Sequence, residues 1–177
     1  MKKAVLVTGA SGSGKSTLSE KLNEMGYKAY DVDAVPGLCT LIDTSTNKPP
    51  INHDNANLEK VKNIDWICDK RKLADIVNAE SADISFYCGA ASNADELYPL
   101  FDLIILLTVD ESVARHRLTH RTANDFARTS EVQDWIMGYK NKWDEKTIKK
   151  GALPVDANRN IDAVARDVIQ ISISAKP

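Results

Sequence analysis

The chain has 177 residues, of which 43% are apolar and 27% charged, and its formal net charge is −2. This composition is typical of one globular domain, and it excludes a disordered chain, a collagen-like repeat and a strong single-sign field for nucleic acid or an anionic membrane. Any bound anion must therefore be held by a local site. The three cysteines have no CxxC spacing, and no apolar run reaches the roughly 18 residues of a membrane span, so we expect a cytoplasmic protein without membrane or nucleic-acid partners.

Apolar runs of strand length alternate with helical stretches along the chain, which predicts βαβ units around a mostly parallel sheet. We expect strands at 4–7, 27–32, 84–87, 103–109 and 153–155, and helices at roughly 15–25, 57–79, 92–97, 111–121, 131–149 and 161–171. Residues 38–57 contain two adjacent prolines and many small polar residues. They are interpreted as an excursion from the core that covers a substrate, with a flap at about 34–57 inside one domain spanning 1–177.

A phosphate-binding loop follows the first expected strand. The pattern G-x-x-x-x-G-K-[ST] is matched by Gly9, Ala10, Ser11, Gly12, Ser13, Gly14, Lys15, Ser16 and Thr17. Glycines allow consecutive backbone N–H groups to converge on phosphate oxygens, and the following helix adds its positive end. Lys15 would reach the β- and γ-phosphates, Ser16 would ligate Mg²⁺, and Thr17 would help to hold the α-phosphate. The alternative is a glycine-rich turn without a ligand.

The same glycines also suggest a dinucleotide-binding turn, with Asp31 about 20 residues further on as the ribose-binding acid. Two observations oppose this alternative. The G-x-G-x-x-G spacing that starts at Gly12 fails at Thr17, and the chain has no Tyr-x-x-x-Lys pair for the proton transfer of a short-chain dehydrogenase.

Two carboxylates, Asp31 and Asp33, close the second expected strand at positions i and i+2. In an extended segment such residues project to one side, and ligands bind at this end of the strands in an open α/β sheet. The pair could ligate Mg²⁺, orient a substrate hydroxyl or deprotonate an attacking oxygen. The alternative is a helix N-cap followed by a solvated turn acid.

The phosphate loop, the segment Tyr30-Asp31-Val32-Asp33 and the arginines after the fourth expected strand together resemble the small P-loop kinases of the nucleoside monophosphate kinase and shikimate kinase group. The resemblance implies a three-layer P-loop NTPase fold with a five-stranded parallel sheet of order 2-3-1-4-5, ATP and Mg²⁺ as cofactors, and a mobile lid. By similarity to shikimate kinases, Asp31 would lie near the metal and Asp33 would meet the substrate hydroxyl. After the third strand the chain has neither of the group's usual motifs, so the acceptor stays open, with Gly89 and Asn93 as candidate contacts.

Four arginines lie within fourteen residues, namely Arg115, Arg117, Arg121 and Arg128. Arginines on a closing lid can stabilise the charge that spreads over a transferred phosphoryl group while water is excluded. The segment 121–130 is similar to the R-T-x-N-x-[FY]-[GA]-[KR] segment of P-loop kinase-like proteins, which makes it the expected lid. Arg121 and Arg128 would act in catalysis, and Arg117 would contact the nucleotide. The alternative is a solvated basic face.

Two side-chain patterns on the later helices are assigned to packing or to chance. Trp135, Tyr139 and Trp143 repeat every four residues, a spacing more typical of core packing than of a base-stacking platform. His116 and His120 have the spacing of a zinc pair, but no glutamate lies between them as in H-E-x-x-H.

Near the carboxyl terminus, the resemblance places the loop after the last strand beside the adenine, where backbone groups of Asp156 and Ala157 could read the base edge. Asp110 is interpreted as a helix cap.

The leading hypothesis is an ATP-dependent kinase for a small-molecule acceptor, with a nucleotide or nucleoside favoured over a shikimate-like polyol. The second hypothesis is a nucleotide-binding switch or adaptor that hydrolyses ATP slowly or not at all. The oligomeric state, monomer or homodimer, is left open.

Overall fold

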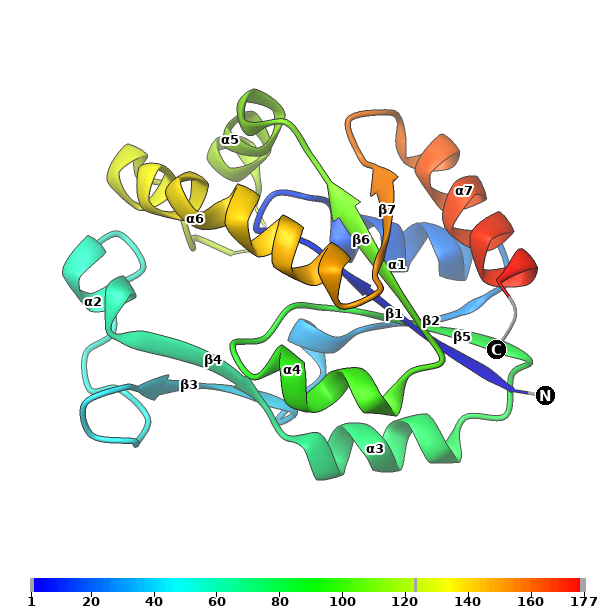
Figure 1. Ribbon diagram of the computed structural model, residues 1–177. Helices are drawn as coiled ribbons and strands as arrows, with labels where there is room; N and C mark the ends of the chain where they lie inside the picture. Colours follow the sequence, from blue (N-terminus) through cyan, green and yellow to red (C-terminus); the bar gives the residue numbers. More distant parts are fainter. Residues whose placement is uncertain (1, 123, 176–177) are drawn as a thin grey trace.

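A five-stranded parallel sheet forms the centre of the computed structural model, which describes residues 2–122 and 124–175 (Figure 1). Its order is β2-β5-β1-β6-β7. The strands are β1 (Lys3–Thr8), β2 (Lys28–Asp31), β5 (Ile84–Cys88), β6 (Leu103–Thr108) and β7 (Leu153–Asp156). Numbered among themselves along the chain, these strands give the predicted order 2-3-1-4-5. The remaining strands, β3 (Cys39–Asp43) and β4 (Ile64–Cys68), pair antiparallel in a separate hairpin.

Helices cover both faces of the sheet (Figure 1). The helices are α1 (Lys15–Glu24), α2 (Leu58–Lys62), α3 (Lys70–Ala79), α4 (Ala94–Leu97), α5 (Glu111–His120), α6 (Ser130–Lys149) and α7 (Ile161–Ser174). Alternate residues of β1 belong to different clusters: Val5 and Val7 pack in the cluster with α1 and α7, and Ala4 and Leu6 pack in the cluster with α3 and α4. A third cluster joins α2, α5 and α6. The predicted three-layer α/β fold is thus confirmed. Among the described helices, none is long and apolar enough to cross a membrane.

The prediction of one helix over 57–79 was wrong. Asn57 caps α2 by accepting from the Lys60 N–H, but that helix ends at Lys62. After Asn63, residues Ile64–Cys68 form β4, and α3 starts only after Asp69. The Asp69 carboxylate accepts from two backbone N–H groups in the first turn of α3. The β4 segment Ile-Asp-Trp-Ile-Cys is rich in β-branched and aromatic residues, and pairing with β3 outweighed the helical pattern around it. The predicted excursion is consequently longer than expected and contains the β3–β4 hairpin.

Candidate functional site

The predicted phosphate loop connects β1 to α1 in a tight backbone turn. The Ser13 N–H donates to the Ala10 carbonyl over 3.1 Å, and Gly14, with a φ of 95°, is the N-cap of α1. Gly12 has a φ of +85°, and a Cβ there would approach the Ala114 carbonyl oxygen of α5 to 2.8 Å. Only glycine fits this position without moving α5. All nine residues of the loop motif line one large cleft.

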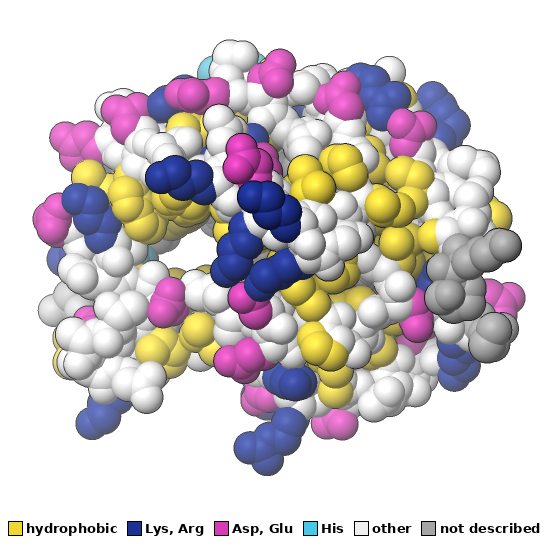
Figure 2. Space-filling model, in the orientation of Figure 1, with side chains coloured by type: hydrophobic (Ala, Val, Ile, Leu, Met, Phe, Trp, Pro, Cys, Tyr) yellow, Lys and Arg dark blue, Asp and Glu magenta, His cyan; other side chains and the backbone are white. Residues whose placement is uncertain are grey.

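This cleft has a volume of about 1470 Å³ and runs from the phosphate loop to the space between α6 and the β3–β4 hairpin. Figure 2 shows the hollow on the left of the molecule, with hydrophobic and basic side chains at its rim. Its lining has eight lysine and arginine side chains against five carboxylates, although the whole chain has a net charge of −2. Five of these basic side chains form ion pairs with carboxylates, which leaves Lys15, Arg117 and Arg121 as the cations without an ion pair among the described lining residues. The basic residues are Lys15, Lys62, Arg117, Arg121, Lys140, Lys146, Lys150 and Arg159.

Lys15 lines this cleft and donates to the carbonyls of Gly9, over 2.8 Å, and Ala10, over 3.2 Å. Burial lowers the pKa of Lys15, and the charges of Asp33 and Asp31 partly offset that effect. The positive charge of Arg121 lowers the same pKa further. Asp31, Asp33 and Arg121, which the sequence analysis selected from two other segments, therefore lie within electrostatic reach of Lys15.

Asp31 and Asp33 both line the cleft at the end of β2. Asp31 also has the structural role that the sequence left open, because its Oδ1 accepts from the Asp33 N–H at 3.2 Å and caps a short 3₁₀ turn. Asp33 Oδ1 accepts from the indole Nε1–H of Trp66 at 2.9 Å. The surrounding protein raises the pKa of Asp33 by desolvation, and Lys15 is the largest of the effects that lower it.

The residues of the cleft fit ATP and Mg²⁺. Ser13 Oγ and Arg121 Nε are buried polar atoms without a hydrogen-bond partner among the described residues, and both side chains line the cleft. Such atoms are the donors that a phosphate group would satisfy. The Ser16 hydroxyl and the Asp31 carboxylate are hard oxygen ligands, the type that Mg²⁺ binds together with phosphate oxygens and water.

Arg117 connects the phosphate loop to the loop after β7. Its guanidinium donates to the carbonyls of Gly12 (3.3 Å) and Ser13 (3.4 Å) in the phosphate loop and of Ala157 (2.8 Å) after β7. It also lines the cleft. Arg115 instead forms ion pairs with Glu111 and Asp134 on the outer surface, which is the solvated face that the sequence allowed.

The two arginines of the predicted lid lie in different surroundings. Arg121 lines the cleft and donates to the Phe126 carbonyl, and burial is the largest cause that lowers its pKa. Arg128 is exposed and does not line the cleft; it donates to the carbonyls of Arg121 (3.1 Å) and Asn124 (3.3 Å). Of the two arginines, only Arg121 lines the cleft in which a phosphate is predicted to bind. Residue 123, which falls inside the predicted lid, lies outside the described residues.

The hairpin contacts the core at its base and the lid segment at its tip. In the loop after β5, Ser92 hydrogen-bonds both the backbone N–H and the carbonyl of Trp66. The Asn93 side chain does the same with the backbone of Cys68. At the outer end, Asn55 Nδ2 donates to Asp125 Oδ1 over 2.7 Å. The predicted flap and lid are therefore in direct contact.

Asn93 and Gly89, the candidate substrate contacts, have structural roles here. Asn93 holds β4 through its side-chain amide. A Cβ at Gly89 would lie 2.7 Å from Cβ of Val32, so this glycine lets β5 approach the turn that contains Asp33. Neither residue lines the cleft.

The aromatic repeat on α6 lines the cleft, so the prediction of core packing was wrong for most of it. Trp135 packs partly against the third cluster and meets Tyr139 edge to face, with ring centroids 5.1 Å apart. Tyr139 is 41% exposed, and Trp143 also faces the cleft. The repeat has the correct period for a helix face, but a period alone does not say whether protein or ligand covers that face.

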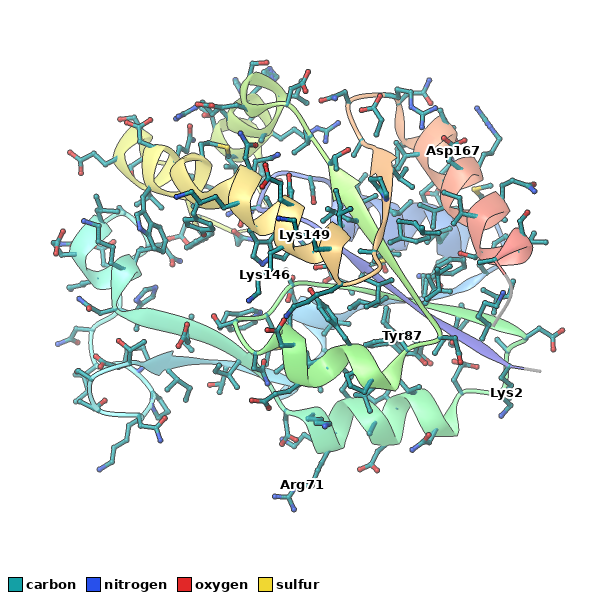
Figure 3. The ribbon with its side chains drawn as sticks, viewed as in Figure 1. Lys2, Arg71, Tyr87, Lys146, Lys149 and Asp167 are labelled. Atoms are coloured by element: carbon teal, nitrogen blue, oxygen red, sulfur yellow. The ribbon has the colours of Figure 1, made fainter. Side chains whose placement is uncertain are left out.

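Further along α6, the same face continues into a basic corner that the sequence reasoning missed. Lys146 and Lys150 line the cleft and form ion pairs with Asp95 of α4, at 3.3 Å in the case of Lys146. Figure 3 shows Lys146 extending from α6 toward α4. Arg71, whose role the sequence left undefined, points from α3 into solvent, away from the cleft (Figure 3).

At the end of β7, the structure modifies the expectation for the adenine side. Asp156 lies outside the cleft lining, and its carboxylate accepts from the Asn158 N–H at 2.9 Å. Ala157 lines the cleft, but its N–H donates to the Thr108 carbonyl and its own carbonyl accepts from Arg117. The N–H of Ala157 is thus already used in a hydrogen bond to β6, so it does not point to a base edge as a free donor.

Two smaller predictions concern α5 and the residue that precedes it. Asp110 stands at the N-cap as predicted, but its side chain makes no capping hydrogen bond. His116 and His120 stack with ring centroids 4.3 Å apart on the wall of the cleft.

Comparison with known proteins places the chain in a family. The sequence model of a family described as an AAA domain matches residues 5–138. The chain belongs to this family. No curated protein matches it by sequence.

Solved structures match the chain over almost its whole length. A shikimate kinase from Acinetobacter baumannii in complex with shikimate is 14% identical, with a TM-score of 0.62 over 98% of this chain and 94% of that chain. A deoxyadenosine kinase from M. mycoides is 14% identical, with a TM-score of 0.57 over 98% and 100% of the two chains. A gluconokinase from Sinorhizobium meliloti is 17% identical, with a TM-score of 0.53 over 97% and 91%. At these identities the likeness shows the fold, which is that of small P-loop kinases, as the sequence resemblance indicated.

Proposed function

We propose that this protein is an ATP-dependent kinase that transfers the γ-phosphoryl group of ATP to a small-molecule acceptor. The observation that carries the proposal is the convergence of Lys15, Asp31, Asp33 and Arg121 in one cleft at the carboxyl ends of the strands. Positioning and electrostatic stabilisation supply most of the catalysis in phosphoryl transfer, and this arrangement is suited to both.

On the nucleotide side, the backbone N–H groups of Gly9–Thr17 would hold the phosphates. Lys15 would exchange its bonds to the Gly9 and Ala10 carbonyls for phosphate oxygens. Ser16 and Asp31 would hold Mg²⁺, which supplies charge neutralisation at the phosphates when it is bound. Arg117 would contact the nucleotide while it braces the loop, and Asp156 would fix the loop beside the base.

On the acceptor side, Asp33 would accept a hydrogen bond from the attacking hydroxyl and take its proton as the new O–P bond forms and the bond from the γ-phosphorus to the β–γ bridging oxygen breaks. Arg121 would stabilise the charge on the transferred group. Arg128 would act through the lid backbone that it holds, because it does not line the cleft. The hairpin would cover the acceptor.

The lining supports a nucleoside or nucleotide as the acceptor. Trp66 on the hairpin and Tyr139 and Trp143 on α6 present aromatic surface to the cleft, which suits a flat ring better than a polyol. Lys146 and Lys150 at the corner beside Asp95 would favour an acceptor that also has an anionic group. A shikimate-like polyol is the less favoured acceptor.

A second function, a nucleotide-dependent switch or adaptor, has its own supporting observation. The loop after β5 binds the hairpin through Ser92 and Asn93 rather than exposing acidic or glycine-rich groups to an acceptor. In a switch, the hydrogen bond between Asn55 and Asp125 would form or break according to which nucleotide is bound.

The two functions are separated by a panel of nucleosides, nucleoside monophosphates, shikimate and gluconate, each incubated with ATP and Mg²⁺ and assayed for a phosphorylated product. We expect turnover with a ring-bearing acceptor. Tight ATP binding without any phosphorylated product would favour the switch, and turnover confined to shikimate or gluconate would overturn the preference for a nucleoside or nucleotide.

A further inference from the structure

Trp66 stands at the junction between the hairpin and the predicted catalytic acid. Its backbone is fixed on both sides, because its N–H donates to Ser92 Oγ over 3.2 Å and its carbonyl accepts from the Ser92 N–H at 2.7 Å. On the other strand it lies opposite Leu41. The main chain of Trp66 is thus bound to the loop after β5, and these bonds do not depend on the contact between the hairpin tip and the lid segment.

The side chain of Trp66 points from this fixed base toward the end of β2. Its Nε1–H, the single hydrogen-bond donor of an indole, donates to Asp33 Oδ1 over 2.9 Å. The Asp33 backbone N–H is already committed to Asp31. The Asp33 side chain itself belongs to a short 3₁₀ turn, so the orientation of its carboxylate depends on groups from elsewhere in the chain.

We propose that Trp66 is a positioning residue that holds one oxygen of the Asp33 carboxylate and so orients the remaining lone pairs toward the acceptor. The inference deepens the proposed function and rests on it for the role of Asp33. It gives the hairpin a part in building the reaction site in addition to covering it. Because Trp66 also lines the cleft, its ring forms the wall next to the oriented acid.

The hydrogen bond is tested without any acceptor by the indole N–H resonances of the ¹⁵N-labelled protein. Each of the three tryptophans contributes one such resonance, and Trp66→Phe, Trp135→Phe and Trp143→Phe assign them by deletion. Asp33→Ala should shift the Trp66 resonance and speed its exchange with water. The matched control is Asp43→Ala, which removes a hairpin carboxylate that accepts from Ser45 and Thr46 instead. A Trp66 resonance that is unchanged by Asp33→Ala, or equally shifted by Asp43→Ala, overturns the proposal.

The positioning role is tested by a double-mutant cycle with an acceptor identified by the panel. Trp66→Phe keeps an aromatic ring and loses only the donor, so kcat should fall by about tenfold to a hundredfold while the KM for ATP changes by less than about twofold. In the Asp33→Ala background the same substitution should change kcat by less than about twofold, because the bond is already absent. An equal effect in both backgrounds would mean that Trp66 has only a structural role.

These two measurements fail independently of the proposed function. If no acceptor is phosphorylated, the kinase proposal fails, and the indole resonance still decides whether Trp66 holds Asp33. If the protein is an active kinase and the resonance is unmoved, the kinase proposal stands and the inference about Trp66 falls.

Discussion

The two halves of the cleft are built in different ways. The proposed phosphate half is one stretch of nine residues, Gly9–Thr17, whose proposed binding groups belong mainly to the backbone and whose shape requires glycine, most clearly where Gly12 meets the Ala114 carbonyl. The proposed acceptor half is assembled from side chains of the hairpin, the loop after β5, α4 and α6. A local backbone site can be identified from a contiguous motif, whereas an assembled side-chain site depends on which segments the fold brings together.

The two halves also differ in how they are held. The phosphate loop is confined by its close approach to α5 at Gly12 and by two hydrogen bonds from Arg117, whose third hydrogen bond reaches the Ala157 carbonyl after β7. Across the acceptor half, the hairpin tip meets the lid segment through the bond from Asn55 to Asp125. We expect the phosphate half to stay rigid and the acceptor half to open and close.

The largest effect should follow from Lys15→Ala, which breaks the phosphate half. ATP affinity should fall on the order of a hundredfold, because a charged donor to the phosphates is lost, and phosphoryl transfer should become undetectable. Calorimetric titration with ATP and Mg²⁺ measures the affinity. Lys149→Ala is the matched control, since Lys149 is an exposed lysine on α6 outside the cleft lining and should leave affinity unchanged. Equal affinity in the Lys15 variant and the wild type would contradict the assignment of the phosphate half.

Asp33→Ala should affect the acceptor half alone. We expect kcat for transfer to fall by about a thousandfold, with ATP affinity within about threefold of wild type, because Asp33 is proposed to contact the acceptor and not the nucleotide. Steady-state kinetics with the acceptor and titration with ATP measure the two quantities. Loss of both together would place Asp33 in the nucleotide site, and loss of neither would favour the switch.

A smaller and graded effect should separate the two arginines of the predicted lid. Arg121→Ala should lower kcat by about a hundredfold, since a buried guanidinium in the cleft is removed from the transferred charge. Arg128→Ala removes hydrogen bonds to two lid carbonyls and should cost less than about fivefold. Both variants are compared by kcat under saturating ATP. Equal losses would indicate that Arg128 enters the cleft when the lid closes.

Much of the fold could be predicted because its signals are local. Uniformly apolar runs marked the central parallel strands, and the loop between the first strand and helix identified the phosphate half. The region 57–79 could not be assigned correctly, because β4 becomes a strand only through its pairing with β3 and its bonds to the loop after β5. Because residues 57–79 were expected to form one helix, the sequence analysis did not predict the hydrogen bond from Trp66 in β4 to Asp33.

By itself, the sequence determined the α/β class and the position of the phosphate loop, because each depends on residues that are adjacent in the chain or repeat with a simple period; the strand order was implied by the family resemblance. Only the tertiary structure decided that Tyr139 and Trp143 face a cleft, that Arg121 and not Arg128 lines it, and that Trp66 meets Asp33. A helix face has the same period whether it packs against protein or lines a cavity, and a hydrogen bond between residues 33 positions apart has no local signature. The phosphate loop could be recognised in the sequence because its residues are contiguous, whereas the other parts of the site combine residues that are far apart in the chain.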